Sequence, residues 1–329
     1  MLNSLLGALE SGLLYAVMAL GVYITFRILD FPDLTVDGSF TTGGAIAAVM
    51  ISGGISPWIA TAAAFFGGMV AGALTGLIHT KGRINGLLSG ILMMIALYSI
   101  NMRIMGKPNV ALLGEDTIFT SVSPLVLMPF VVIAIKLLLD LFLRTELGLA
   151  LRATGDNQRM IRSFGTHTDN TIILGLSLSN GLVAVSGALI AQQSGFSDIS
   201  SGIGMIVIGL ASVIIGEAIF GSRTVFWATL AAILGSVVYR VVVALALRVE
   251  WLEQTDLKLI TAIIVIIALV LPTVSRSLKQ KSLARERAAE ITGSSGGKAW
   301  EVGSDAAAFP RVQAVSSRNA GRENRPDRH

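Results

Sequence analysis

The chain has 329 residues, of which 53% are hydrophobic and only 14% are charged, and its mean hydropathy is +0.73. Soluble domains keep about a quarter of their residues charged, so this composition excludes a water-soluble globular protein and predicts an integral membrane protein. The formal net charge of +4 belongs to the C-terminal part, because residues 1–275 hold 14 basic and 15 acidic residues whereas residues 276–329 hold 11 and 6. A nucleic-acid-binding protein needs a basic folded face, so we expect no nucleic acid among the partners.

Nine apolar segments follow one another along the first 275 residues. They are about 20 residues long, which suits helices that cross a hydrocarbon core of ~30 Å, and no alternating strand pattern recurs. The segments cover approximately residues 2–26, 36–51, 57–78, 84–104, 124–142, 171–191, 203–219, 225–247 and 257–274. We therefore expect an all-α, polytopic helical membrane bundle with eight or nine transmembrane segments. The second and seventh segments are short and rich in glycine, which predicts short or discontinuous helices.

The basic residues of the connecting loops predict the orientation of the chain. Residues 79–83, residues 144–162, Arg223 and residues 276–287 are basic, whereas the alternate loops are neutral or acidic. The positive-inside rule places the basic loops in the cytoplasm, so we expect an outside N-terminus and a cytoplasmic C-terminus.

The end of the chain differs in composition from the apolar body. Residues 281–329 are dominated by glycine, serine, alanine and charged residues, so we expect a polar, disordered tail after a transmembrane domain of residues 1–280. Residues 293–298 lack the spacing of a phosphate-binding loop, which predicts that this chain hydrolyses no ATP. The chain has no cysteine and only three scattered histidines, so we expect no metal site and no cofactor.

A polar cluster of Arg27, Asp30, Asp33 and Asp37 lies between the first two segments, and it has two interpretations. In the first, Asp33 caps the short second helix and Asp30 pairs with Arg27. In the second, a discontinuous helix begins inside the membrane and lines a translocation pathway. The pathway residues would be Asp33, Asp37, Ser39, Thr41 and Thr42, whose oxygens could face a zwitterionic solute.

Several other polar residues within the segments predict internal contacts. Lys136 and Asp140 are four residues apart and predict a local ion pair. Glu217, at the end of the seventh segment, is predicted to pair with the nearby Arg223. Asn101 and Asn180 could form hydrogen bonds between helices.

Glycines spaced four apart, at positions 68, 72 and 76, indicate close packing between helices within the bundle. The short, glycine-rich second and seventh segments run in opposite directions in the predicted topology. Such a pair is typical of an inverted repeat that has the pathway at its interface.

A long polar interruption, residues 147–165, separates the fifth and sixth segments. Its composition predicts a short amphipathic helix at the cytoplasmic surface, where apolar side chains alternate with charged ones. Two interpretations stay open: a helix held by anionic membrane lipid, and a helix that contacts a partner protein.

Two blocks of sequence resemble a known family. The first is Arg152-Ala-Thr-Gly-Asp-Asn157, followed by Met160 and by Phe164-Gly-Thr-His-Thr-Asp169. The second runs from Tyr15 to Tyr23 and continues as Asp33-Leu-Thr-Val-Asp37-Gly-Ser-Phe40 and Gly43-Gly44. Together they are similar to the permeases of ABC transporters of the branched-chain amino acid and ribose type, and most similar to the tryptophan/tyrosine transport permeases. The resemblance covers about residues 5–275.

The resemblance implies a permease subunit of an ABC importer in the plasma membrane of a prokaryote. It implies a second permease chain and a pair of ATP-binding subunits that hold ATP and magnesium. It also implies an extracytoplasmic solute-binding protein that delivers an amino acid to the outer loops, chiefly residues 106–123 and 193–202. It also implies a coupling helix over residues 153–164 that contacts the ATP-binding subunit. The contact residues would be Arg152, Gly155, Asp156, Asn157, Arg159, Met160, Arg162 and Phe164. We expect Arg159→Glu or Gly155→Pro to uncouple transport and to leave the membrane fold intact.

Two other classes of protein compete with this interpretation. A secondary transporter driven by an ion gradient would use buried carboxylates, for which Glu10 and residues 30–37 are candidates. An intramembrane enzyme is disfavoured, because the sequence carries no His-Glu-x-x-His or Gly-x-Ser-x-Gly motif and no paired catalytic carboxylates in the apolar segments.

Overall fold

The structure is a computed structural model that describes residues 2–165 and 167–246 together with residues 259, 262, 263 and 266. The predicted boundary between residues 280 and 281 and the predicted tail lie outside the described residues. The predicted ninth segment, residues 257–274, lies outside them except for those four positions.

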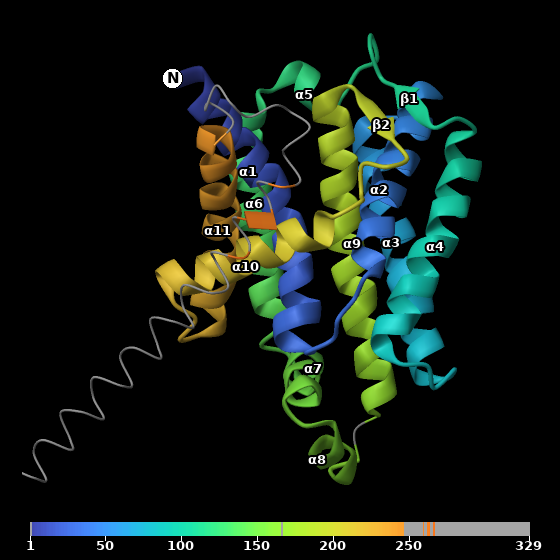
Figure 1. The fold of residues 1–329 in the computed structure, drawn as a ribbon, viewed down its shortest axis with the longest axis vertical. Helices are drawn as coiled ribbons and strands as arrows, with labels where there is room; N and C mark the ends of the chain where they lie inside the picture. Colours follow the sequence, from blue (N-terminus) through green and yellow to red (C-terminus); the bar gives the residue numbers. More distant parts are fainter. Residues whose placement is uncertain (1, 166, 247–258, 260–261, 264–265, 267–329) are drawn as a thin grey trace, which may run out of the picture. The chain divides into compact units, whose positions relative to one another are not determined.

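The described part of the chain is almost entirely helical (Figure 1). Its elements are α1 (Leu2–Tyr23), the π-helix η1 (Ile24–Ile28), α2 (Thr35–Ser52), α3 (Pro57–Thr80), α4 (Gly86–Met105), β1 (Asn109–Ala111), α5 (Ile118–Ser121), α6 (Pro124–Phe142), α7 (Glu146–Asp156), α8 (Gln158–Ser163), α9 (Thr168–Ser194), β2 (Phe196–Asp198), α10 (Met205–Phe220) and α11 (Val225–Ala246).

Six helical stretches of the described chain are long and apolar enough to cross a membrane: Leu5–Ile28, Pro57–Thr80, Gly86–Met105, Pro124–Phe142, Thr168–Ser194 and Val225–Ala246. This finding confirms a polytopic helical membrane protein. The predicted second and seventh segments, which were expected to be short, form α2 and the shorter helix α10, and neither is among these six stretches.

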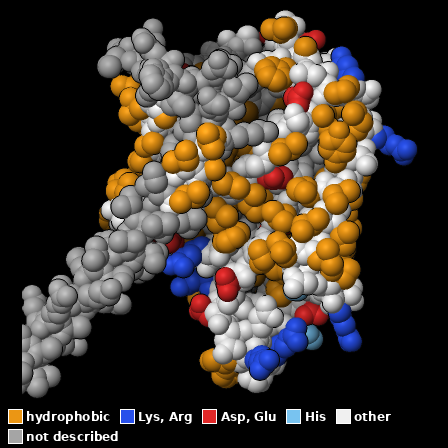
Figure 2. Space-filling model, in the orientation of Figure 1, with side chains coloured by type: hydrophobic (Ala, Val, Ile, Leu, Met, Phe, Trp, Pro, Cys, Tyr) orange, Lys and Arg blue, Asp and Glu red, His pale blue; other side chains and the backbone are white. Residues whose placement is uncertain are grey.

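The long helices run side by side, with the short α7 and α8 at one end and α5, β1 and β2 at the other (Figure 1). On the face drawn in Figure 2, hydrophobic side chains cover much of the surface between the two ends, and most of the charged side chains lie towards the ends. This distribution is that of a protein whose middle is surrounded by hydrocarbon.

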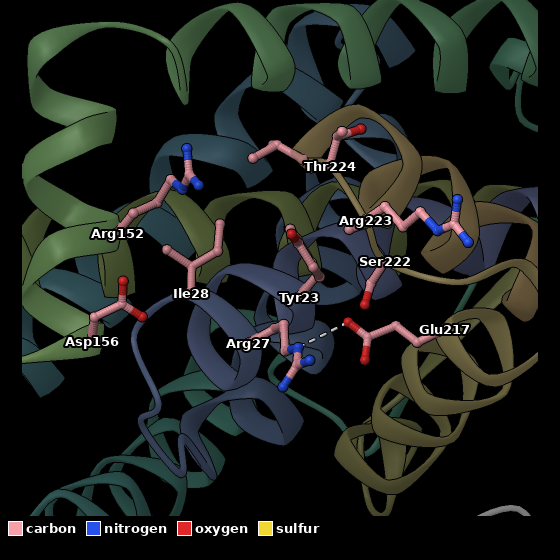
Figure 3. A pocket seen from close by; sticks show the side chains of 11 residues that line it. Tyr23, Arg27, Ile28, Arg152, Asp156, Glu217, Ser222, Arg223 and Thr224 are labelled. Atoms are coloured by element: carbon pink, nitrogen blue, oxygen red, sulfur yellow. Dashed lines mark hydrogen bonds and ion pairs between the residues drawn. The ribbon is translucent and has the colours of Figure 1, made fainter. Parts of the chain in front are cut away.

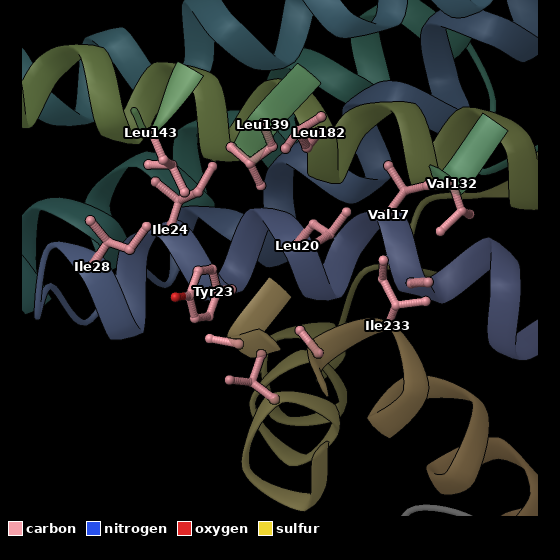
Figure 4. Packing of buried hydrophobic residues seen from close by; sticks show 14 of the residues in the cluster. Val17, Leu20, Tyr23, Ile24, Ile28, Val132, Leu139, Leu143, Leu182 and Ile233 are labelled. Carbon is pink, nitrogen blue, oxygen red and sulfur yellow. The ribbon is translucent and has the colours of Figure 1, made fainter. Parts of the chain in front are cut away.

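Helix α1 is one centre of packing. The cluster drawn in Figure 4 joins side chains of α1 and η1 to those of α6, α9 and α11. Its members include Val17, Leu20, Ile24, Ile28, Val132, Leu139, Leu182 and Ile233. Because α1 and η1 pack together against these helices, a displacement of η1 would also displace several of them.

Helix α9 is the most deeply buried of the six candidate spans, and small residues allow its neighbour to approach it. A Cβ atom added to Gly68 or Gly72 of α3 would collide with the backbone of α9 at Asn180 and Leu176. A Cβ atom added to Gly76, one turn further along α3, would also collide with the backbone of α9. The glycine spacing therefore serves packing within this chain, as the sequence predicted.

Helix α2 begins inside the bundle rather than at its surface. The Asp33 carboxylate accepts the Thr35 amide at 2.9 Å and the Asn180 side-chain amide at 2.6 Å. Asn180 lies near the middle of α9, and Asp33 is fully buried. Helix α10 also begins at mid-height and is steeply inclined to the long helices (Figure 1). The two segments are thus short, continuous helices that begin within the bundle, and their glycine content had indicated short or discontinuous helices.

The ion pairs differ in part from those predicted. Arg27 pairs with Glu217 through a contact of 2.9 Å between Nε and Oε1, and it pairs with neither Asp30 nor any other described acid. The predicted Asp30–Arg27 and Glu217–Arg223 pairs were therefore wrong. Sequence proximity suggested both, but the fold brings the end of α10 against η1, 190 residues away in the chain.

The predicted pair of Lys136 and Asp140 is confirmed, and both side chains are buried. Asp140 also accepts the hydroxyl of Thr229 at 2.8 Å, and the Lys136 ammonium lies 3.5 Å from the ring centroid of Phe226. The pair therefore joins α6 to α11 rather than acting within α6 alone.

Candidate functional site

Helix α7 is docked against the bundle. Thr145 caps its N-terminus, where its hydroxyl accepts the Gly148 amide, and the helix buries Leu151 and Thr154. The Thr154 and Thr171 hydroxyls are 2.9 Å apart, which joins α7 to the first turn of α9. A side chain at Gly155 would overlap the Ile28 carbonyl oxygen, so α7 contacts η1 through bare backbone.

The predicted single helix over residues 153–164 is wrong, because the chain breaks at Asn157 into α7 and α8. Asn157 has φ −160° and ψ 93°, an extended conformation, and its side-chain oxygen accepts the Met160 amide at 3.1 Å. Asparagine is a favoured N-cap, so it ends one helix and starts the next. Helical periodicity alone did not reveal this break.

Helix α8 presents its residues at the surface. Met160 is 54% exposed and Phe164 is 73% exposed, so two large apolar side chains lie on the surface of this polar end of the molecule. Arg162 holds α8 in place, since it donates to the Thr168 hydroxyl at 2.6 Å and to the Asp169 carboxylate at 3.0 Å.

The eight predicted contact residues therefore fall into two groups. Gly155 packs inside the fold, while the other seven are exposed at the α7–α8 end: Arg152, Asp156, Asn157, Arg159, Met160, Arg162 and Phe164. These seven combine charged and apolar side chains on a short, surface-lying element. Such a surface suits contact with a protein, as well as with a lipid headgroup layer.

A polar pocket of about 430 Å³ connects α7 to the rest of the molecule (Figure 3). Arg152 and Asp156 of α7 lie on one side of it, and the pair of Arg27 and Glu217 lies opposite, with Arg223 beside them. Sequence reasoning missed this pocket, because its residues come from three separate parts of the chain, residues 23–28, 152–156 and 217–228.

Asp37 fastens the other end of α10. Its carboxylate accepts the backbone amides of Gly204 and Ile206, each at 2.8 Å. One turn further along α2, the Thr41 hydroxyl accepts the Gly202 amide at 3.1 Å. The carboxylate meets the N-terminus of α10, where its negative charge is favoured by the helix dipole.

The five predicted pathway residues are also divided by the structure. Asp33, Ser39 and Thr42 are buried between helices, and they line none of the pockets described above or below. Asp37 and Thr41 line a second cavity, of about 350 Å³, between α2 and α4. The predicted hydrogen bonds of the two asparagines are found: Asn101 donates to the Gly38 carbonyl at 3.2 Å, and Asn180 donates to Asp33.

Sequence reasoning passed over Arg240, which lies within α11. Its guanidinium lies 3.6 Å from the ring centroid of Tyr15, which in turn stacks on Phe40. A charged residue inside an apolar segment is a signal that the sequence did carry.

At the opposite end of the described bundle, the loop after α4 and the loop after α9 form one structure. Strands β1 and β2 pair antiparallel, with Asn109 opposite Asp198. Two hydrogen bonds from Ser200, one from its amide and one from its hydroxyl, hold the pKa of Asp198 below its usual range. Leu113, in the loop after β1, is 87% exposed.

These features define a polytopic membrane protein whose two short helices, α2 and α10, begin inside the bundle, with a folded element at one end. Residues 4–270 match the family described as branched-chain amino acid transport system, permease component. The chain belongs to this family, so it is the permease component of an ABC-type transport system for amino acids or sugars, and it is not an enzyme.

Several curated relatives are similar to the chain. A tyrosine transport system permease protein of Clostridioides difficile is 47% identical over 280 residues, which cover 85% of this chain and 95% of that protein. An uncharacterized protein of Rickettsia prowazekii is 36% identical, with 82% and 97% covered. A ribose import permease protein of Escherichia coli is 28% identical, with 57% and 61% covered. No solved structure matches the chain.

Proposed function

We propose that this chain is the membrane-spanning subunit of an ABC importer for an amino acid, with aromatic amino acids preferred over branched-chain ones. The observation that carries the proposal is the 47% identity to a tyrosine transport system permease protein over 95% of its length. The ribose import permease and a branched-chain amino acid permease of Salmonella typhimurium are 28% and 26% identical over 61% and 70% of their lengths. They therefore give weaker support for a sugar or a branched-chain amino acid as the substrate of this chain.

The proposed assembly contains two permease chains, identical or paired, and two ATP-binding subunits that hold ATP and magnesium. It lies in the plasma membrane of a prokaryote, with the α7–α8 end and the C-terminus in the cytoplasm. The basic residues near that end, including Arg144, Arg159 and Arg162, support this orientation.

The ATP-binding subunit would contact α7 and α8. The exposed Met160 and Phe164 could fill an apolar groove in it, and Arg159 could pair with an acidic residue at the rim. We favour the protein contact over the lipid contact, because the two hydrogen bonds of Arg162 link α8 to the first turn of α9, and a contact that transmits movement needs such a link.

A chain of contacts leads from this surface to the middle of the membrane. Movement of α7 would press on η1 through the close contact of Gly155 with Ile28. The pair of Arg27 and Glu217 would pass the displacement to the end of α10, whose other end is held by Asp37. Helix α10 would therefore be the element that ATP-driven closure reorients.

The solute-binding protein would dock at the opposite end. The predicted outer contacts were residues 106–123 and 193–202, and their pairing as β1 and β2 gives them one folded surface. Pairing of the strands allows both loops to respond together when a partner binds.

The test is ATP hydrolysis by the complete transporter in proteoliposomes. The chain is co-expressed with the ATP-binding subunit encoded next to it, and the binding protein is added with or without amino acids. We expect tyrosine-loaded binding protein to raise the hydrolysis rate several-fold and to support uptake. If no ATP-binding subunit co-purifies and uptake follows an imposed proton or sodium gradient, the protein is a secondary transporter and the proposal fails.

A further inference from the structure

The cavity between α2 and α4 combines a few polar groups with an apolar wall. Its polar groups include Asp37 and Thr41 of α2 and Ser99 and Asn101 of α4, while Ile95, Tyr98 and Ile203 supply apolar surface. Its volume of about 350 Å³ falls in the range of small-molecule sites. Cavities of this composition bind a ligand by burying its apolar part and by fixing its orientation through the polar groups.

Among the residues that line this cavity, Asn101 has a buried side chain whose hydrogen bonds are incomplete. It is 1% exposed, and its amide nitrogen donates to the Gly38 carbonyl, but its side-chain oxygen has no hydrogen-bond partner. A buried acceptor without a donor costs roughly 1–3 kcal/mol. A ligand that donates a hydrogen bond in this cavity would remove that cost.

Asp37 contributes the negative charge of the cavity. Two backbone amides of α10 orient its carboxylate, and no described Lys or Arg forms an ion pair with it. Each carboxylate oxygen can accept a further hydrogen bond. No basic residue lines the cavity, so its electrostatic preference is for a cation.

We infer that this cavity receives the ammonium group and the apolar side chain of an amino acid with a large or aromatic side chain. The ammonium has three donors, which match the Asp37 carboxylate, the Asn101 oxygen and the Thr41 hydroxyl. The side chain lies against Ile95, Tyr98 and Ile203, where Tyr98 can stack on an aromatic ring. A sugar, with hydroxyls on every side, would leave several of them unpaired against this wall.

This inference rests on the proposed function and specifies its substrate site. The site joins α2 and α4 to the residues just before α10, and Asp37 is shared between the site and the start of α10. Reorientation of α10 would therefore alter the ammonium site directly. A change in this shared contact would weaken binding of the ammonium group and release the substrate when the transporter changes its conformation.

The absence of cysteine from the chain allows a direct test. Ser99 lines the cavity and is exposed, so Ser99→Cys places a single thiol there. Labelling of this thiol by a water-soluble maleimide is measured on the permease band of the complete transporter in nanodiscs, without binding protein. The probes are L-tyrosine, tyramine and 3-(4-hydroxyphenyl)propionate, which lacks the ammonium. Ser121→Cys, on an exposed outer segment away from the cavity, is the matched control.

We expect L-tyrosine and tyramine at millimolar concentration to slow labelling of Ser99→Cys at least threefold, while the acid and the Ser121→Cys control show no change. Asn101→Leu, added to Ser99→Cys, should raise the half-protecting concentration at least tenfold, whereas Asn101→Asp keeps an acceptor and should retain protection. Equal protection by the acid, or the same response in both asparagine variants, overturns the ammonium assignment.

Uptake by the same complex separates failure of the site from failure of the function. If Ser99→Cys proteoliposomes import tyrosine with binding protein but tyrosine never protects the thiol, the site is wrong and the proposed function stands. If no amino acid is imported and none protects, both are overturned.

Discussion

The carboxylate of Asp37 accepts the backbone amide of Gly204 at 2.8 Å, which fastens the N-terminus of α10 to the first turn of α2. At its other end α10 is tied to η1 through Glu217 and Arg27. A short helix held at both ends can change its orientation only if at least one of these contacts changes.

Asp37→Asn should weaken the start of α10. The amide has only one accepting oxygen and no charge, so one hydrogen bond and the attraction to the helix dipole are lost, about 1–3 kcal/mol in total. Thermal unfolding of the purified chain in one detergent measures this loss. Asp30→Asn, at an exposed position, should unfold at the wild-type temperature. Equal unfolding temperatures for all three proteins would show that Asp37 does not hold α10.

Arg27→Glu should impair transport more than folding. The Arg27 side chain is 58% exposed, and exposed ion pairs contribute roughly 0.2–1 kcal/mol, so the loss of stability should be small. Two adjacent carboxylates would nevertheless repel each other and push η1 away from α10. We expect uptake per ATP hydrolysed to fall several-fold.

The reversed pair, Arg27→Glu with Glu217→Arg, restores the attraction and should recover a substantial part of the coupling. A double variant no better than Arg27→Glu alone would indicate that the ion pair itself does not transmit movement.

The docking element is tested best at Arg159. Arg159→Glu changes only an exposed side chain, so the fold should persist while binding-protein-stimulated ATP hydrolysis falls at least tenfold. Arg144→Glu is a control with the same charge change before α7, and its hydrolysis rate should stay near wild type. Wild-type stimulation in Arg159→Glu would remove Arg159 from the contact with the ATP-binding subunit.

The structure changes the expectation for Gly155. The sequence predicted that Gly155→Pro would leave the fold intact, whereas the packing predicts that substitutions here disturb it. Even Gly155→Ala places a methyl group on the Ile28 carbonyl oxygen, so α7 or η1 must shift. We therefore expect reduced yield and a lower unfolding temperature, and Gly155→Pro should be worse because the ring also cannot donate a helical hydrogen bond. Gel filtration and thermal unfolding would detect both effects, and a fully stable Gly155→Ala would contradict the packing seen here.

Lys136→Met should be strongly destabilising. It leaves the buried Asp140 carboxylate with only the Thr229 hydroxyl, and removal of one partner of a buried pair typically costs about 3–5 kcal/mol. The double variant Lys136→Met with Asp140→Leu removes both charges and should unfold closer to wild type than Lys136→Met does. If the double variant is less stable than Lys136→Met, the unpaired carboxylate of Asp140 is not the cause of the destabilisation.

The sequence by itself determined the class of fold and most of the helices. Runs of apolar residues predicted the membrane spans, because a helix must be about 20 residues long to cross hydrocarbon. The length of such a run can be read directly from a sequence. The glycines at positions 68, 72 and 76 and the pair of Lys136 and Asp140 were also predicted correctly, since residues three or four apart lie on one face of a helix.

Only the tertiary structure decided which distant residues meet. Arg27 pairs with Glu217 and Asp37 binds the start of α10, contacts that span 190 and 167 residues and leave no periodic trace in the sequence. The break at Asn157 depends on a single side chain that caps α8, and the cavity beside Asn101 depends on how α4 packs against α2. Local composition sets which segments enter the membrane, whereas the packing of whole helices sets which polar groups face one another there.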